Sequence, residues 1–210
     1  MKKRNLRSMK LPRIFNIVSA ALFLILLIAF LADWLGNSPI RAAQLWTGRI
    51  AFVFLLASLT ITPLRTITGN AMIIPLRKTF GLNSFYWAFL HFLVFAGLNL
   101  QFNTQAILEA IFFRRFIIPG AVAFFILTIL AITTLDPVKK ALARIWRKIH
   151  MWVFPASILI LLHYSWSVNA TLPPEGAIKP LPLIAAIYLL LMFVLRLKPV
   201  KLAIIHRRQR

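Results

Sequence analysis

Six apolar segments take up nearly all of this 210-residue chain, and they restrict its possible folds more than any other feature. They cover residues 14–33, 45–64, 81–100, 116–135, 147–166 and 178–196. A helix of about 20 apolar residues crosses the hydrocarbon core of a bilayer, which is about 30 Å thick. Because 60% of the residues are hydrophobic and only four are acidic, the chain lacks the polar surface that a soluble domain needs. The sequence therefore predicts an all-α integral membrane protein, a six-transmembrane-helix bundle.

The net charge of +21 is distributed unevenly between the two faces of this bundle. Twenty of the 25 basic residues fall in the N-terminal arm, the second and fourth loops and the C-terminal tail, which share one face. The positive-inside rule places that face, with both termini, in the cytoplasm. We therefore expect a cytoplasmic basic arm at 1–13, a transmembrane domain at 14–196 and a cytoplasmic basic tail at 197–210. Such a basic face favours the headgroups of anionic membrane lipids and argues against nucleic acid as a partner.

The absence of cysteine excludes several kinds of redox centre. Disulfides, iron–sulfur clusters and covalently attached haem all need cysteine, so any haem is of the non-covalent b type. The chain also has no G-x-G-x-x-G motif and no room for a nucleotide-binding domain. A separate molecule or protein, such as a quinone or a flavin carrier, must therefore supply any electrons.

Three histidines, His91, His150 and His163, lie within the apolar segments. Ionisable side chains are costly in a bilayer and indicate function by default, and histidine is the commonest neutral ligand of haem iron. The 13 residues from His150 to His163 correspond to about 20 Å of helix, enough to place one histidine near each membrane face. The alternative is that backbone carbonyls satisfy these side chains.

Counting residues along the helices predicts which histidines meet. If the third helix enters the membrane near Thr79, His91 lies about 18 Å inside, which matches the depth of His163 rather than that of His150. We therefore expect His91 and His163 to be the two axial ligands of one haem iron. His206, in the basic tail, is not expected to be a ligand.

The role of His150, near the cytoplasmic face, is less restricted by the sequence. It could bind a second haem, act at the site of a flavin or quinone donor, or form a hydrogen bond with a haem propionate. The neighbouring basic residues Arg77, Lys78 and Arg147 favour an anionic partner such as flavin mononucleotide or a propionate. One haem or two are both compatible with the residues.

Proline and glycine mark the expected helix ends. We expect Asn37-Ser38-Pro39 to end the first span and begin an outer loop, and Thr62-Pro63-Leu64-Arg65 to close the second span at the cytoplasmic side. Pro119-Gly120 is expected to allow a kink early in the fourth span. Asp136-Pro137 predicts a helix start with Asp136 as N-cap, and residues 138–148 are expected to run without a break into the fifth span. Pro155 lies between His150 and His163, where a kinked or π-type turn would change their relative direction.

Several short motifs occur in order along the chain: Thr47-Gly48, Thr62-Pro63-Leu64-Arg65, Arg77-Lys78-Thr79-Phe80-Gly81-Leu82, Leu90-His91, Thr133-Thr134, Trp146-x-x-Ile149-His150 and His163-Tyr164-x-Trp166. In this combination they resemble the MsrQ (YedZ) family, the haem-binding membrane subunit of a periplasmic methionine sulfoxide reductase system. The similarity covers roughly residues 15–170. The wider group is the ferric-reductase-like transmembrane domain, whose members usually carry two histidines on each of two helices. Here Arg77 stands at the fourth position.

The sequence departs from the family pattern at three positions. Lys78 stands where an arginine is frequent, Ala143 where a glycine precedes the tryptophan of the fourth loop, and Phe154 where a tyrosine is common. The family implicates the basic pair at Arg77 and Lys78 in binding flavin mononucleotide. Arginine and lysine differ in their contacts to phosphate, so Lys78 weakens that inference.

The resemblance implies a subunit of the bacterial inner membrane that passes electrons outward. The donor would be the quinone pool or a cytoplasmic flavin reductase, and the acceptor a periplasmic molybdopterin enzyme that carries the substrate-reducing site and repairs oxidised methionine in proteins. A reductase of extracellular ferric iron, or of another outside acceptor, shares the same haem features. A proton or metal transporter is less favoured, because the four acidic residues fall in loops or at span ends. A purely structural subunit would leave the histidines unexplained.

Overall fold

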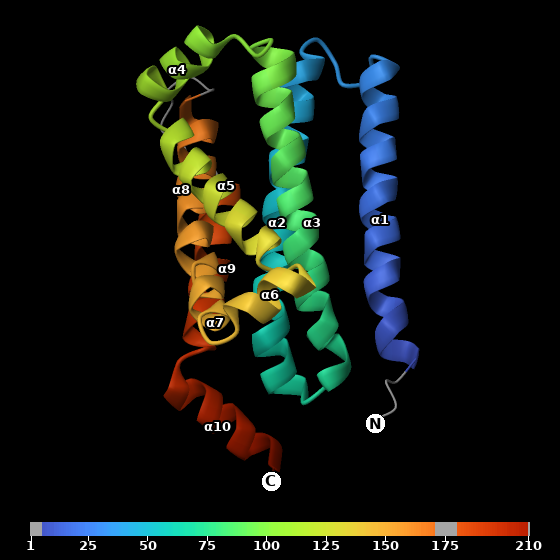
Figure 1. Ribbon diagram of the computed structural model, residues 1–210, viewed down its shortest axis with the longest axis vertical. Coiled ribbons are helices and arrows are strands. Elements are labelled where there is room, and N and C mark those ends of the chain that lie inside the picture. Colours follow the sequence, from blue (N-terminus) through green and yellow to red (C-terminus); the bar gives the residue numbers. More distant parts are fainter. Residues whose placement is uncertain (1–5, 171–179, 210) are drawn as a thin grey trace. The chain divides into compact units, whose positions relative to one another are not determined.

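The computed structural model describes residues 6–170 and 180–209, and all regular structure in these ranges is helical (Figure 1). The elements are α1 (Leu6–Leu31), α2 (Pro39–Thr68), η1 (Ala71–Ile73), α3 (Ile74–Leu93), the π-helix η2 (Val94–Asn99), α4 (Thr104–Phe113), α5 (Ile117–Ile132), α6 (Asp136–Leu142), α7 (Trp146–His150), α8 (Val153–Ala170), α9 (Pro180–Val194) and α10 (Lys198–Gln209). The predicted all-α class is confirmed. Residues 1–5 of the basic arm, Arg210 of the tail and residues 171–179, where the sequence with Pro173-Pro174 predicts a short outer turn, lie outside the described residues.

Four helical stretches of the described chain are long and apolar enough to cross a membrane. These are Lys10–Leu31, Pro39–Thr68, Ala71–Asn99 and Trp146–Val168. Two further pairs of helices pass the same test only together: α4 with α5, bent by 113°, and α9 with α10, bent by 73°. The fourth and sixth predicted spans thus correspond to helices of 16 and 15 residues, shorter than the predicted spans of about 20. By length and composition, residues 6–170 and 180–209 thus provide four candidate spans, or up to six if each bent pair crosses once.

Residues 1–87 and 187–210 form one compact unit, called unit 1 here. Its core holds buried apolar side chains of α2 and α3, among them Leu55, Leu59 and Phe80. The Arg196 guanidinium, at the junction of α9 and α10, donates to the carbonyl oxygens of Met192 and Leu59. A cation with a long apolar stem is therefore tied to backbone acceptors rather than left in hydrocarbon.

Residues 88–186 form the second compact unit, called unit 2, in which α5 and α8 lie side by side (Figure 1). Ile126, Leu130 and Ala156 form the buried cluster between these two helices. The end of α3 joins α5 through aromatic stacking, because Phe92 lies 5.2 Å from Phe124, ring centroid to ring centroid. All three histidines of the apolar segments belong to unit 2.

Two prolines expected to interrupt helices do not do so. Pro39 occupies the first turn of α2, where Ser38 is the N-cap, so the second helix begins six residues earlier than predicted. A proline there loses no helical hydrogen bond, because the first amides of a helix have no partner within it. Pro63 lies inside α2, which continues to Thr68 and ends at Gly69 with φ 72°. The segment predicted to close the second span, Thr62-Pro63-Leu64-Arg65, is helical throughout, and the helix ends three residues after it.

The continuous helix predicted from residue 138 into the fifth span is also wrong. Helix α6 ends at Leu142, and Ala143 follows it with φ 30°, a backbone conformation unfavourable for residues other than glycine. Asp136 is the first residue of α6 rather than its cap, since Leu135 takes the N-cap position. The predicted helix start is therefore displaced by one residue.

A second break separates α7 from α8. Pro155 has no N–H to bond with the carbonyl of Met151, and the chain tightens there instead. The amides of Met151, Trp152 and Phe154 each bond to the carbonyl three residues earlier, at 3.0–3.2 Å. The turn expected near Pro155 is thus a narrowed one of 3₁₀ type and not a π-turn.

Candidate functional site

The imidazole rings of His91 and His163 lie together inside unit 2. Their centroids are 6.1 Å apart and their planes are inclined by 82°. His91 lies in the last turn of α3, just before the π-helix η2, and His163 lies in the middle of α8. The structure thus brings together the two histidines that the depth count paired.

A backbone hydrogen bond orients the ring of His163. Its Nδ1 lies 2.7 Å from the carbonyl oxygen of Phe116, the residue that precedes α5. A carbonyl oxygen only accepts, so Nδ1 carries the hydrogen and Nε2 keeps its lone pair. A histidine that binds a metal usually donates its other ring nitrogen in this way, which fixes the tautomer and the ring direction. The Phe116 ring also packs on the imidazole, with centroids 5.9 Å apart.

Gly120, in the first turns of α5, leaves the space that His163 occupies. A Cβ atom at this position would lie 2.5 Å from Nδ1 and 2.9 Å from Cε1 of His163. Real Cβ contacts essentially never fall below 3.0 Å. The sequence suggested a kink at Pro119-Gly120, whereas α5 runs through both residues and the glycine serves close packing. The only signal in the sequence was a glycine inside an apolar run.

The distance between the two rings fits two ligands of one metal ion. A bond from a metal to an imidazole nitrogen is about 2.0–2.1 Å. With ring bonds near 1.33 Å, each nitrogen lies about 1.1 Å from its ring centroid, so two opposite ligands place their centroids about 6.3 Å apart. The observed separation is 6.1 Å. In the described residues, no three His, Cys, Asp or Glu side chains gather as a metal site, so the protein offers a pair of ligands. A pair suits haem, whose porphyrin supplies the other four bonds to iron.

His150 lies apart from this pair, at the other end of α5. Its Nε2 is 3.2 Å from Oγ1 of Thr133, the C-cap of α5, whereas His163 bonds to the N-cap residue of the same helix. The 16 residues of α5 separate these two ends by about 24 Å. The Trp146 ring packs on His150 at 4.1 Å, and its Nε1 donates to the Thr133 carbonyl at 2.8 Å. The ammonium group of Lys139 lies 4.8 Å from the Trp146 ring, so the surroundings are cationic and aromatic.

The three predicted basic residues are all exposed. Arg77 and Lys78 lie in the first two turns of α3 within unit 1, where the hydroxyl of Ser58 donates to the Arg77 carbonyl at 3.0 Å. Arg147 lies on α7, next to His150 along the chain but in unit 2. A flavin or propionate contact by these residues stays a prediction. His206 lies in α10, an exposed helix end of unit 1.

Residues 47–161 match the family model described as the ferric reductase like transmembrane component. The matched segment is more than half of the chain, contains His91 and His150, and ends two residues before His163. Domains of this kind typically bind haem. The chain is thus a multi-pass membrane protein, and it belongs to the family of ferric reductase-like transmembrane electron-transfer components.

Proposed function

We propose that this protein is a b-type haem subunit that carries electrons across a membrane, with His91 and His163 as the axial ligands of one iron. The proposal depends chiefly on the two imidazole rings at 6.1 Å, one of them oriented by the Phe116 carbonyl. When bound, haem supplies reversible one-electron chemistry at a potential set by its ligands and surroundings. The protein's own side chains orient the two histidines and pack around them.

The residues around the pair hold the ligand geometry. The bond from His163 to Phe116 keeps Nε2 unprotonated and directed away from α5, and Gly120 lets the ring approach that helix. Phe89 and Phe92 pack on Phe124 and so fix the end of α3 that carries His91. A rigid pair of ligands reduces the structural change that accompanies a change in iron charge, which favours electron transfer.

His150 would serve the cytoplasmic side, where electrons enter. Its hydrogen bond to Thr133 and its packing on Trp146 place it about one length of α5 from the His163 end. A second haem there and a role beside a donor are both compatible with this position. We favour the donor role, since exposed Arg147 and the cation Lys139 suit an anionic partner.

The partners follow from the resemblance to the MsrQ family. The donor would be the quinone pool or a cytoplasmic flavin reductase, because the chain has no nucleotide-binding motif of its own. The acceptor would be a periplasmic molybdopterin enzyme that reduces methionine sulfoxide in proteins, with this subunit in a bacterial inner membrane. The departures at Lys78, Ala143 and Phe154 do not fall on the histidine pair.

A second candidate is reduction of extracytoplasmic ferric iron or of another outside acceptor, which the description of the matching family favours. A proton or metal transporter is less well supported. Asp33, Glu109 and Asp136 are exposed rather than placed along a path between helices, and Glu175 lies outside the described residues.

Absorption spectra of the purified protein, oxidised and reduced with dithionite, test the haem assignment. We expect a low-spin spectrum that both His91→Ala and His163→Ala abolish, because each removes one of two bonds to the same iron. His206→Ala is the matched control and should leave the spectrum unchanged. A protein that stays colourless when expressed with ample haem would refute the proposal. Independent, additive losses of haem in the two variants would assign the histidines to different irons.

The outside acceptor is tested separately in membrane vesicles that contain the haem-loaded protein. One assay adds a periplasmic molybdopterin reductase with a methionine sulfoxide substrate, and the other adds a ferric chelate. We expect haem reoxidation with the first and none with the second. The reverse result would assign the protein to ferric reduction.

A further inference from the structure

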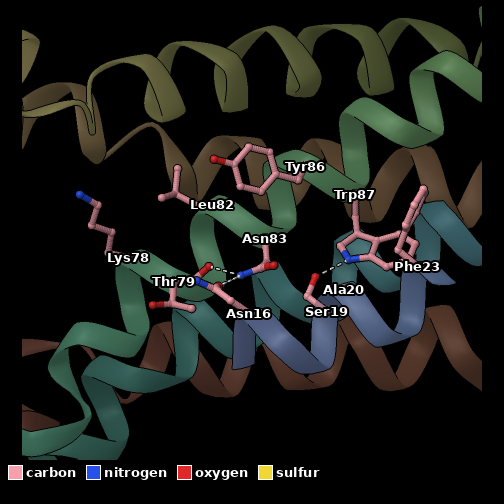
Figure 2. A pocket seen from close by; sticks show the side chains of 10 residues that line it. All are labelled: Asn16, Ser19, Ala20, Phe23, Lys78, Thr79, Leu82, Asn83, Tyr86 and Trp87. Atoms are coloured by element: carbon pink, nitrogen blue, oxygen red, sulfur yellow. Dashed lines mark hydrogen bonds between the residues drawn. The ribbon is translucent and has the colours of Figure 1, made fainter. Parts of the chain in front are cut away.

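A cavity of about 520 Å³ lies between α1 and α3 in unit 1, and neither of the predicted haem ligands, His91 and His163, lines it (Figure 2). It is bounded by residues between Asn16 and Phe23 of α1 and between Lys78 and Trp87 of α3. Pockets for small molecules usually have volumes of about 300–1,000 Å³. The cavity is therefore large enough for the polar head of a lipid-soluble molecule.

Two hydrogen bonds cross from α1 to α3 along one side of this cavity (Figure 2). The amide Nδ2 of Asn83 donates to Oδ1 of Asn16 at 2.8 Å and also to the Thr79 carbonyl at 2.9 Å. The indole Nε1 of Trp87 donates to the hydroxyl oxygen of Ser19 at 2.8 Å. Such bonds hold helices together within a membrane. These two hydrogen bonds explain how α1 and α3 are held together, but they do not explain why a cavity lies beside them.

The Asn16–Asn83 pair retains hydrogen-bonding capacity. Both hydrogens of the Asn83 amide are used, and within residues 6–170 and 180–209 neither Oδ1 of Asn83 nor Nδ2 of Asn16 makes a hydrogen bond. The pair therefore offers one acceptor and one donor next to each other. A ligand hydroxyl group can use both, and a ligand carbonyl group can accept from the donor alone. Polar side chains within a span often mark the site of such a ligand.

The rest of the lining is aromatic and apolar. Tyr86 and Phe23 are 59% and 40% exposed, so their rings form the open edge of the cavity, and Leu82 lies beside Tyr86 (Figure 2). Asn83 is five residues from Lys78 along α3, or about 7.5 Å deeper. Lys78 is the one charged residue in the lining. These surroundings suit a flat, uncharged ring better than a phosphate headgroup, which needs several charged contacts.

We infer that this cavity binds the headgroup of an isoprenoid quinone, with a ring oxygen at the Asn16–Asn83 pair and the isoprenoid tail leaving past Phe23 or Tyr86 into lipid. The inference rests on the proposed function, in which a quinone is one of the candidate donors, and it assigns the quinone a binding site of its own on α1 and α3. The donor role proposed for His150 concerns an anionic partner such as a flavin and a different set of residues. It concerns binding and orientation of the ring.

The test measures binding of decylubiquinone to the full-length, haem-loaded protein in phosphatidylcholine nanodiscs. Ala20 lines the cavity and Ala21 does not, although both are exposed on α1, one position apart. Ala20→Phe should fill the cavity and weaken quinone binding at least about tenfold, whereas Ala21→Phe should change it by less than about twofold. A second variant, Asn16→Leu, keeps the side-chain size and should also weaken binding, because it removes the donor that the Asn16–Asn83 pair offers to the ring.

An azido derivative of the same quinone should label peptides that contain residues 16–23 and 78–87. Equal quinone affinity for wild type, Ala20→Phe and Asn16→Leu would overturn the inference. So would loss of quinone binding in nanodiscs of phosphatidylglycerol, since that outcome identifies the occupant as an anionic lipid. Haem content is measured on the same samples. If the protein holds no haem but its quinone binding is weakened by Ala20→Phe, only the proposed function is refuted. If the protein holds haem but its quinone binding is not weakened by Ala20→Phe, only this inference is refuted.

Discussion

Gly120→Ala is the substitution that most directly tests how the His163 ring is held. The added Cβ would lie 2.5 Å from Nδ1, so the ring has to retreat by about 0.9 Å to reach the 3.4 Å at which ordinary contact begins. A retreat of this size along the hydrogen bond to Phe116 would lengthen it from 2.7 Å to about 3.6 Å, beyond the length at which such bonds form. Loss of an orienting partner typically weakens metal binding about 10–100-fold, or about 1.4–2.7 kcal/mol.

The same substitution should not destabilise the fold, because alanine is favoured over glycine within a helix by about 1 kcal/mol. Titration of haem into the apoprotein, followed by the Soret band, measures the affinity, and thermal unfolding of the apoprotein measures the fold. Gly81→Ala is the control, since its Cβ would meet Oγ of Ser58 at an ordinary 3.6 Å. Wild-type haem affinity and spectrum in Gly120→Ala would refute the packing argument.

Three further predictions follow from the break at Ala143, the His150 environment and the charge distribution. Ala143→Gly should stabilise the protein by about 1 kcal/mol, seen as a higher midpoint of thermal unfolding, because φ 30° costs glycine little; an unchanged midpoint would count against strain at this position. His150→Ala should slow reduction by the natural donor in stopped-flow experiments more than it lowers haem content, and wild-type rates would exclude a donor role. A reporter fused after Arg210 should be cytoplasmic and one inserted near Asn169 should be outside; the opposite pattern would reverse the direction of electron flow.

The existence of the helices could be predicted, because bilayer thickness sets the length of an apolar span. The residues at which the helices begin and end could not be predicted. A proline can stop a helix, begin one or be tolerated inside one, and the sequence around Pro39 and Pro63 does not distinguish these cases. The short fourth and sixth helices were also missed. Each lies next to a sharp bend, of 113° between α4 and α5 and of 73° between α9 and α10, and both bends fall at arginines that border the apolar run.

The pairing of His91 with His163 could be predicted because helical rise is nearly independent of side chains, so counting residues gives depth. Their role as haem ligands stays a prediction. The partners of the pair could not be found in this way. The Phe116 acceptor is a backbone carbonyl, which every residue has, and the need for glycine at position 120 arises only when α8 packs on α5. The position of Ala143 could be predicted in part. The resemblance to the MsrQ family indicated that glycine is frequent there, and the positive φ of Ala143 explains why glycine is favoured at this position.

A π-turn holds one residue more than an α-turn, so the helix Val94–Asn99 contains extra chain directly after the turn that carries His91. Deleting one residue there would restore regular helix and leave His91 in place. A deletion just before His91 would instead rotate its side chain by about 100°. The loop beyond Asn99 can therefore change length over evolutionary time without disturbing the histidine pair. Related proteins could in this way acquire different external partners while the buried centre stays the same.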